Sequence, residues 1–368
     1  MPDLPMRLLV TGATGFVGQA LCARLKQDKM ALRAAVRSPI AALSAPAHTI
    51  VGEINGATDW QKALHGVTDV IHLAARVHVM IDRAKDPLSE FRRVNVQGTL
   101  NLAQQAAAAG VRRLVYVSSI KVNGEATPAG QAFCESDVPN PQDAYAVSKH
   151  EAEQVLYQVA AQTGMEVVVI RPPLIYGPGV KANFAALMQA VQQGWPLPFG
   201  AVHNLRSLVA LDNLVDFVLT CSVHTLAANQ TFLISDGHDL STADLVRGLA
   251  QVAGVSARLI QIPTVVLNGA GRLFSLFSLG DAIEKLCSNL QVDIAKAQGL
   301  LGWRPPVTVK LAVRPSSWPA RHNRSGNSRS VLASSPGRRT RAWADGHLRK
   351  APGTRNWTAA MHRNNTKY

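Results

Sequence analysis

Short apolar segments alternate with helix-like segments through the first half of the chain, and this alternation limits the fold more than any other feature. Stretches rich in Ala, Leu and Gln, such as residues 94–110, separate the apolar segments. Strands that are apolar throughout are usually buried on both faces, and their alternation with helices indicates a parallel sheet. The predicted fold is α/β, a doubly wound parallel sheet with strands at residues 7–12, 31–37, 48–53, 69–75, 113–119 and 166–172.

The first strand runs into a glycine-rich turn and then a helix, within LLVTGATGFVGQAL (8–21). Glycines at this junction permit a tight turn, a close approach of the backbone to a pyrophosphate, and close packing of helix on strand. The helix N-terminus then presents free N–H groups to the phosphates. We therefore predict a Rossmann-like dinucleotide site that includes Gly12, Thr14, Gly15, Phe16, Val17 and Gly18.

The end of the second strand bears on which dinucleotide binds. NAD sites usually carry an acidic residue about 20 residues beyond the glycines, where it accepts from the ribose hydroxyls. Arg37 follows Val36 at this place, and its planar guanidinium suits a 2′-phosphate. NADP(H) is therefore favoured and NAD(H) is the alternative. The ends of the third and fourth strands add the predicted cofactor contacts Glu53, Ile54, Leu73, Ala74 and Ala75.

A serine, a tyrosine and a lysine are placed to meet beside this site. Ser119 ends the fifth strand, and parallel sheets bind ligands at the carboxyl ends of their strands. Tyr145 and Lys149 follow in AYAVSKHEAE (144–153), four residues apart and therefore on one helix face. A free tyrosine has a pKa near 10, and a nearby ammonium favours its phenolate.

Taken together, these motifs resemble those of the extended short-chain dehydrogenases/reductases, the NAD-dependent epimerase/dehydratase family. The resemblance covers about residues 6–309 and implies that Ser119 is the catalytic serine, Tyr145 the acid/base and Lys149 its helper, which also holds the nicotinamide ribose. It adds Asn95 and Pro172 to the cofactor contacts. The motifs that carry it are TGATGFVG, HLAA, NVQGT, SSIKVNGE, YAVSK and RPPLIYGPG.

The two residues after Ser119 bear on which reaction is expected. Nucleotide-sugar 4,6-dehydratases of this family carry an Asp-Glu pair there, whereas this chain has Ile120 and Lys121, so elimination of water is not expected. The segments SSIKVNGE, 179–184 and 199–216 resemble a bacterial polysaccharide group that makes 6-deoxy-N-acetylhexosamine nucleotides. We predict NADPH-dependent reduction of a UDP-4-keto-6-deoxy-N-acetylhexosamine.

Two other functions stay open. A UDP-sugar 4-epimerase with tightly bound NAD would use the same three residues, although Arg37 favours a consumed NADPH. A non-catalytic dinucleotide-binding protein is less expected, because Tyr145 and Lys149 are both present. By resemblance, the nucleotide-sugar contacts are Lys121, Asn183 and Arg206.

The alternation of strands and helices breaks down near residue 175. We predict a dinucleotide-binding Rossmann domain over 6–175 and a smaller, mostly helical C-terminal lobe over 176–310, interleaved with the first and binding the nucleotide sugar. Residues 262–280 are expected to form an amphipathic helix over the substrate site. In relatives, the long helix near 88–109 and the Tyr145 helix form a four-helix bundle across a dimer, so a homodimer is expected.

The strong positive charge belongs to the last part of the chain. Residues 311–368 hold twelve Lys and Arg against the single acid Asp345, and so carry eleven of the fourteen net positive charges. This tail lacks hydrophobic periodicity and is rich in Arg, Ser, Gly and Pro, which predicts disorder. A basic tail without a basic folded face does not indicate specific nucleic-acid binding.

Composition and spacing point to a cytoplasmic protein. The four cysteines lie far apart without metal-ligand spacing, so we predict reduced thiols and no metal site. The N-terminus carries no long apolar signal segment, and the most apolar later stretch is too interrupted for a transmembrane segment.

Overall fold

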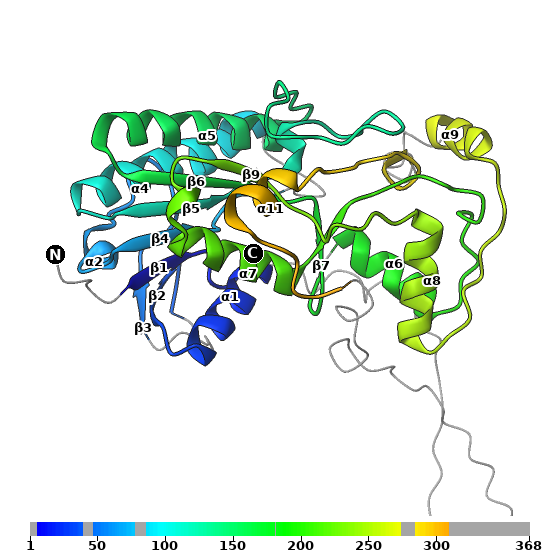
Figure 1. Cartoon of the computed structure of the whole chain (residues 1–368), viewed down its shortest axis with the longest axis horizontal. Helices are drawn as coiled ribbons and strands as arrows, with labels where there is room; N and C mark the ends of the chain where they lie inside the picture. The colour runs from blue at the N-terminus through cyan, green and yellow to red at the C-terminus, as the bar shows by residue number, and fades with distance from the viewer. Residues whose placement is uncertain (1–5, 40–46, 78–85, 181, 274–283, 309–368) are drawn as a thin grey trace, which may run out of the picture. The chain divides into compact units, whose positions relative to one another are not determined.

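The computed structural model describes residues 6–39, 47–77, 86–180, 182–273 and 284–308. Seven parallel strands form one sheet in the order β3-β2-β1-β4-β5-β6-β9, which confirms the predicted doubly wound fold (Figure 1). The strands are β1 (Arg7–Thr11), β2 (Ala31–Val36), β3 (Ala47–Ile50), β4 (Asp69–His72), β5 (Arg113–Val117), β6 (Glu166–Arg171) and β9 (Thr231–Leu233).

Several strands end earlier than the sequence predicted. β3 stops at Ile50 and β4 at His72, whereas strands to residues 53 and 75 were expected. The chain leaves the ladder at these carboxyl ends because it turns there into loops, and the N–H of Ala74 bonds to the side chain of Thr11, Oγ1, at 3.2 Å instead of to a backbone carbonyl of a neighbouring strand. The extra residues lie at the edge of the sheet where the site is expected.

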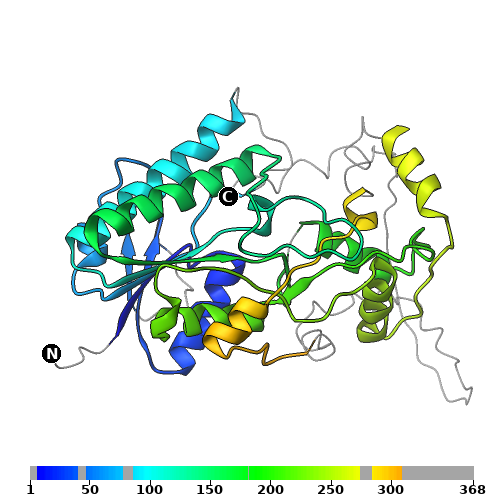
Figure 2. The ribbon, with the colours of Figure 1, turned by 45° about the horizontal axis from the view of Figure 1, so that its top comes forward.

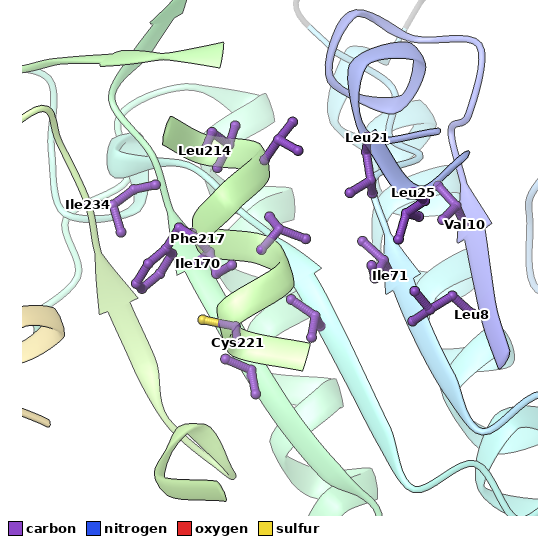
Figure 3. Packing of buried hydrophobic residues seen from close by; sticks show 14 of the residues in the cluster. Leu8, Val10, Leu21, Leu25, Ile71, Ile170, Leu214, Phe217, Cys221 and Ile234 are labelled. Carbon is purple, nitrogen blue, oxygen red and sulfur yellow. The ribbon is translucent and has the colours of Figure 1, made fainter. Parts of the chain in front are cut away.

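Helices cover both faces of the sheet (Figure 2). One face carries α2 (Gln61–Leu64), α4 (Gly98–Ala108) and α5 (Ala144–Thr163), and the other carries α1 (Phe16–Gln27), α7 (Leu211–Val223) and α11 (Ala295–Leu301). Successive strand residues point to opposite faces, so that Leu8 and Val10 pack in one core cluster and Leu9 in the other. Figure 3 shows the first cluster, where α1 and α7 pack on the sheet.

The long helix expected near 88–109 is present but less regular than predicted. It comprises α3 (Pro87–Phe91), the π-helix η1 (Arg92–Gln97) and α4, with helical backbone angles at both junctions. Asp86 caps its start by accepting from the N–H of Ser89, and Pro87 occupies the first turn, where a missing N–H costs nothing. Short π segments are frequent at functional sites.

Residues beyond 175 contribute to two regions. β7 (Leu174–Tyr176) pairs with β8 (Leu208–Ala210), and α6 (Ala182–Gln192) packs on α8 (Thr242–Ala253). β9, α7 and α11 instead join the seven-stranded sheet and its core. The remaining short elements are the 3₁₀ helices η2 (Ile120–Val122) and η3 (Thr225–Ala227), and the helix α9 (Thr264–Leu273).

Two predictions concern segments that lie partly or wholly outside the described residues. α9 covers part of the helix expected at 262–280, and residues 274–283 lie outside the described residues, as does the whole tail 311–368. No helix in the described part of the chain is long and apolar enough to cross a membrane. All four cysteines are free, as predicted.

Candidate active site

The glycine turn after β1 is built for close backbone contact. Gly12 has φ +68°, and a Cβ added there would lie 2.7 Å from the backbone nitrogen of Ala74. A Cβ at Gly18 would lie 2.1 Å from the carbonyl oxygen of Gly12, so α1 packs against the turn only because glycine is present. Side chains at these positions would push the helix away from the strand.

The N-terminus of α1 fits an anionic group. Gly15 is its N-cap, no side chain caps it, and its first turn, which starts with Phe16 and Val17, holds no acidic residue. The first N–H groups of a helix have no partner within the helix, and the helix dipole favours negative charge at this end. The turn and helix could therefore hold the pyrophosphate of a dinucleotide.

The predicted adenosine contacts lie at the ends of β2 and β3. Arg37 directly follows β2, whose register pairs Ala35 with Thr11 of β1, and its side chain is exposed. Glu53 is also exposed, with a carboxylate 3.6 Å from the guanidinium of Arg93. Ile54 touches the start of α4, because a Cβ on Gly98 would lie 2.8 Å from Ile54 Cγ2.

His72 holds the end of β4 to two neighbouring elements. Nδ1 lies 2.6 Å from Thr11 Oγ1 of β1, and Nε2 lies 2.9 Å from Thr99 Oγ1 of α4. Burial, with a smaller contribution from the Lys149 charge, lowers the pKa of His72 to about 3. The imidazole is therefore neutral and structural, and it fixes the loop that contains Leu73, Ala74 and Ala75.

Asn95 links this loop to the helix that carries Tyr145. It lies in the π-helix η1, is buried, and donates from Nδ2 to Ser148 Oγ at 2.9 Å and to the Arg76 carbonyl at 3.0 Å. Its Oδ1 accepts from the Arg76 N–H at 2.7 Å. Asn95 thus connects the end of β4 to α5, next to the position where the resemblance places the cofactor.

Ser119 and Tyr145 meet at the carboxyl end of β5. Ser119 follows β5 and precedes η2, and Tyr145 is the second residue of α5. Burial raises the pKa of Tyr145 well above its usual value, and the charge of Asp143 adds to this effect. The nearby Ser119 hydroxyl opposes the shift in part.

Lys149 lies one helical turn further along α5. Its Nζ donates to the carbonyl of Val117 at 2.9 Å and lies 4.5 Å from the centre of the Tyr116 ring and 6.0 Å from that of Tyr145. Burial lowers the pKa of Lys149 to about 7, although the carboxylate of Glu153 partly offsets this. The structure thus brings Ser119, Tyr145 and Lys149 together.

A buried ion pair beside these residues escaped the sequence analysis. Arg171, at the end of β6, contacts Glu153 of α5 at 2.5 Å, and its Nη1 donates to Asn123 Oδ1 at 2.8 Å. Ser118 donates to the same glutamate at 2.5 Å. The network fixes α5 against the ends of β5 and β6. An arginine closing the apolar strand EVVVIR was the available signal, but its partner could not be read from the sequence.

The predicted substrate residues lie on three different elements. Lys121 is on η2, where its Nζ contacts Asp143 at 2.5 Å and Glu125 at 3.0 Å. Asn183 is the second residue of α6. Arg206 donates through Nη1 to the carbonyls of Lys285 and Ser288, at 2.5 and 3.0 Å.

Pro172, another predicted cofactor contact, fixes the segment after Ser119. Its carbonyl accepts from the N–H of Ile120 at 3.0 Å.

Across the described residues, no three His, Cys, Asp or Glu side chains are grouped to hold a metal ion.

A model of the NAD dependent epimerase/dehydratase family matches residues 8–234. The chain belongs to the NAD-dependent epimerase/dehydratase family. The match spans the glycine turn and the Ser119, Tyr145 and Lys149 group, and it confirms the predicted family and an NAD(P)-dependent enzyme of epimerase or reductase type.

The relatives of this chain include an epimerase and a reductase. A UDP-glucose 4-epimerase from Vibrio cholerae is 47% identical over 313 residues, covering 83% of this chain and 93% of the relative. A GDP-6-deoxy-D-mannose reductase from Pseudomonas aeruginosa is 29% identical, covering 86% of this chain and 99% of the relative.

A solved structure of the same fold is UDP-glucose 4-epimerase from Thermotoga maritima with UDP-glucose. It superposes with a TM-score of 0.68 at 21% identity and covers 85% of this chain and 97% of the solved chain. Another, from Pseudomonas aeruginosa and complexed with NADPH, has a TM-score of 0.64 at 24% identity and covers 85% and 99%. At these identities the structures show the fold alone.

Proposed function

We propose that this protein is an oxidoreductase that acts on C4 of a UDP-linked sugar. The observation that carries the proposal is the placement of Ser119 directly after β5 with Tyr145 and the buried Lys149 on α5, where Lys149 Nζ donates to the Val117 carbonyl of β5 at 2.9 Å. The glycine turn follows β1, two strands away, and neighbouring strands lie about 4.8 Å apart, so the two sites are on the order of 10 Å apart. A dinucleotide held at the turn can reach Tyr145.

The side chains divide the proton chemistry of such a reaction. The nicotinamide cofactor would supply or accept the hydride. Tyr145 donates its phenolic proton to the C4 oxygen during reduction, while Ser119 donates a hydrogen bond to the same oxygen. The raised pKa of Tyr145 keeps it protonated at neutral pH, as an acid catalyst requires, and the Lys149 ammonium favours the phenolate when the reaction runs towards oxidation.

The finer proposal is NADPH-dependent reduction of a UDP-4-keto-6-deoxy-N-acetylhexosamine. The exposed Arg37 after β2 supports NADPH, because its guanidinium is available for a 2′-phosphate beside the glycine turn. Ile120 and Lys121 provide no carboxylate pair for eliminating water. An enzyme of this kind would consume a keto sugar made by another enzyme.

A 4-epimerase is the second candidate, and one observation favours it. The Vibrio cholerae relative, 47% identical over most of both chains, is a UDP-glucose 4-epimerase. An epimerase would use the same three residues with a bound NAD that is regenerated in each cycle. Arg37 has no evident use in that reaction.

The nucleotide-sugar contacts and the assembly complete the proposal. We propose that Asn183 and Arg206 contact the nucleotide sugar, with Lys121 near them. A homodimer would form through α4 and α5, which lie side by side on one face of the sheet (Figures 1 and 2). The four free thiols are compatible with the reducing cytoplasm. A monomeric mass at micromolar concentration would refute the dimer.

Product analysis separates the two reactions. UDP-4-keto-6-deoxy-N-acetylglucosamine with NADPH or NADH should give the C4 alcohol, with NADPH preferred by about tenfold or more. UDP-glucose and UDP-N-acetylglucosamine without added cofactor should stay unchanged. Their conversion to the C4 epimers would identify an epimerase. The variant Arg37→Asp should abolish the preference for NADPH, and equal use of both cofactors by the unmodified protein would contradict the role of Arg37.

A further inference from the structure

Lys121 connects the segment of Ser119 to the helix of Tyr145, the two residues that we propose act on the C4 oxygen. Its backbone N–H donates to Ser119 Oγ at 3.3 Å, and its Nζ contacts Asp143 Oδ2 at 2.5 Å. Asp143 lies two residues before Tyr145. The two ends of Lys121 thus contact the Ser119 hydroxyl and the start of the Tyr145 helix.

Asp143 uses its two carboxylate oxygens for different purposes. Oδ1 caps α5 by accepting from the N–H of Ala146 at 2.7 Å, and Oδ2 accepts from Lys121. An N-cap fixes the position and direction of the first helical turn, and that turn contains Tyr145. The ion pair therefore fixes the first turn of α5 to the η2 segment.

We propose that Lys121 and Asp143 are positioning residues, which hold Ser119 and Tyr145 at a fixed separation and balance the charge beside the Tyr145 hydroxyl. The inference rests on the proposed function, in which Ser119 and Tyr145 act on the C4 oxygen. It adds a role for Lys121 besides the predicted substrate contact, and it gives Asp143 its first role.

Among the described residues, charged and titratable groups face Tyr145 from several elements. Asp143 precedes it, Lys149 follows it on α5, and the buried Tyr116 hydroxyl faces it from β5. Beyond Asp143, Lys121 also contacts Glu125, which lies 3.7 Å from the Lys285 ammonium. On α3, the neighbouring side chain is the uncharged ring of Phe91.

The two residues should shift the titration of Tyr145 in opposite directions. Lys121→Met removes the ammonium that contacts the Asp143 carboxylate, so the Tyr145 pKa should rise. Asp143→Asn keeps an oxygen that can cap α5, because Asn is a good N-cap, but it removes the negative charge, so the pKa should fall. A purely structural role would produce no such opposition.

Absorbance titration of the phenolate tests the inference without any sugar. Each variant is titrated with bound NADP⁺, and the curve of the same protein carrying Tyr145→Phe is subtracted. We expect the Tyr145 transition to move up by about 0.5–1 pH unit in Lys121→Met and down by a similar amount in Asp143→Asn. Lys121→Arg, which keeps the charge, should restore the unmodified curve.

Lys285→Met is the matched control, since it removes an ammonium from the same cluster that contacts Glu125 and neither Ser119 nor Asp143. It should leave the curve in place. Superimposable curves for Lys121→Met and Asp143→Asn, or shifts in the same direction, would overturn the inference. Failure of the unmodified protein to reduce or epimerise any UDP-sugar would refute the proposed function instead, and the titration would still decide the roles of Lys121 and Asp143.

Discussion

The cofactor side and the substrate side of this molecule are organised in different ways. On the cofactor side, short contiguous stretches carry the important residues: Gly12 in the turn after β1 and Gly18 in the first turns of α1 lie within seven residues, and one helix holds Tyr145 and Lys149. On the substrate side, Arg206 is held by the carbonyls of Lys285 and Ser288, about 80 positions away along the chain. Local geometry determines the first region, and long-range backbone contacts determine the second.

Substitutions in the two regions should therefore affect different properties of the protein. A change on the cofactor side should affect dinucleotide binding or the stability of the whole sheet. A change on the substrate side should loosen segments 204–207 and 284–290 while the cofactor still binds. Substitutions in each region, paired with controls, test this separation.

Gly18→Ala should have the most severe effect. A methyl group at this position would lie 2.1 Å from the carbonyl oxygen of Gly12, so α1 would have to move away from β1 and the turn would lose its shape. We expect loss of NADPH binding, measured by fluorescence titration, and a large loss of soluble folded protein. Gly248→Ala is the control, because no atom lies within 4 Å of a Cβ there, and helical Ala should stabilise by about 0.5–1 kcal/mol. Equal behaviour of the two variants would contradict the tight turn.

Arg171→Met should destabilise the protein by about 3–5 kcal/mol in denaturant unfolding, because it leaves the buried Glu153 carboxylate unpaired. Arg92→Met is the control, because Arg92 also pairs with a glutamate of α5, Glu151, but this pair is partly exposed. Such pairs contribute about 0–1 kcal/mol. A loss below 1 kcal/mol for Arg171→Met would show that the ion pair does not hold α5 to β6.

Arg206→Met tests the substrate side. Its guanidinium donates to the Lys285 and Ser288 carbonyls, and hydrogen bonds from charged groups contribute about 1.5–3 kcal/mol. We expect faster amide hydrogen exchange at residues 284–290 with unchanged NADPH affinity. Arg247→Met, in an exposed pair with Asp244 of α8, should leave the exchange unchanged. Weakened NADPH binding in Arg206→Met would contradict the separation of the two regions.

Lys149→Met should give a smaller, pH-dependent gain in stability together with loss of turnover. The pKa of Lys149 is lowered by burial to about 7, below the unfolded value near 10.4. The buried ammonium therefore destabilises the folded protein below pH 7, and this effect disappears as the pH rises towards 10. The Tm of the variant minus that of the unmodified protein should be larger at pH 7 than at pH 10.

Lys296→Met provides the matched control for that pH dependence. Lys296 also donates to a carbonyl, that of Thr231, and lies over an aromatic ring, that of Phe232, but its side chain is only half-buried. For Lys296→Met, the Tm of the variant minus that of the unmodified protein should change less between pH 7 and pH 10. The same difference for both lysines would contradict the burial of Lys149 as the cause.

The same contrast explains what the sequence could predict. The sheet, the glycine turn and the Tyr145 helix were predictable because their signals are periodic or contiguous, and the fold and family are confirmed. The Glu153–Arg171 pair, the π segment around Asn95 and the Lys121–Asp143 contact were not predicted. Each depends on which loop meets which helix after the sheet has formed, and no local pattern encodes that.

The substrate side was harder to predict for the same reason. Arg206 was selected by resemblance, yet it contacts Lys285 and Ser288, and no pattern in the sequence places their segment beside it. Asn204 likewise donates to the carbonyls of Leu286 and Ser288, at 3.1 and 2.8 Å. The roles of these residues towards a nucleotide sugar stay predictions.

Whether Tyr145 transfers the proton to the C4 oxygen is decided by the single-turnover rate of C4 reduction by Tyr145→Phe, measured with NADPH and UDP-4-keto-6-deoxy-N-acetylglucosamine. The substitution removes only the phenolic oxygen and keeps the ring that packs against Phe91. The rate should fall by about a hundredfold to ten-thousandfold, with NADPH affinity and Tm unchanged. A near-normal rate would show that Tyr145 does not transfer the proton and would contradict the assignment of this site.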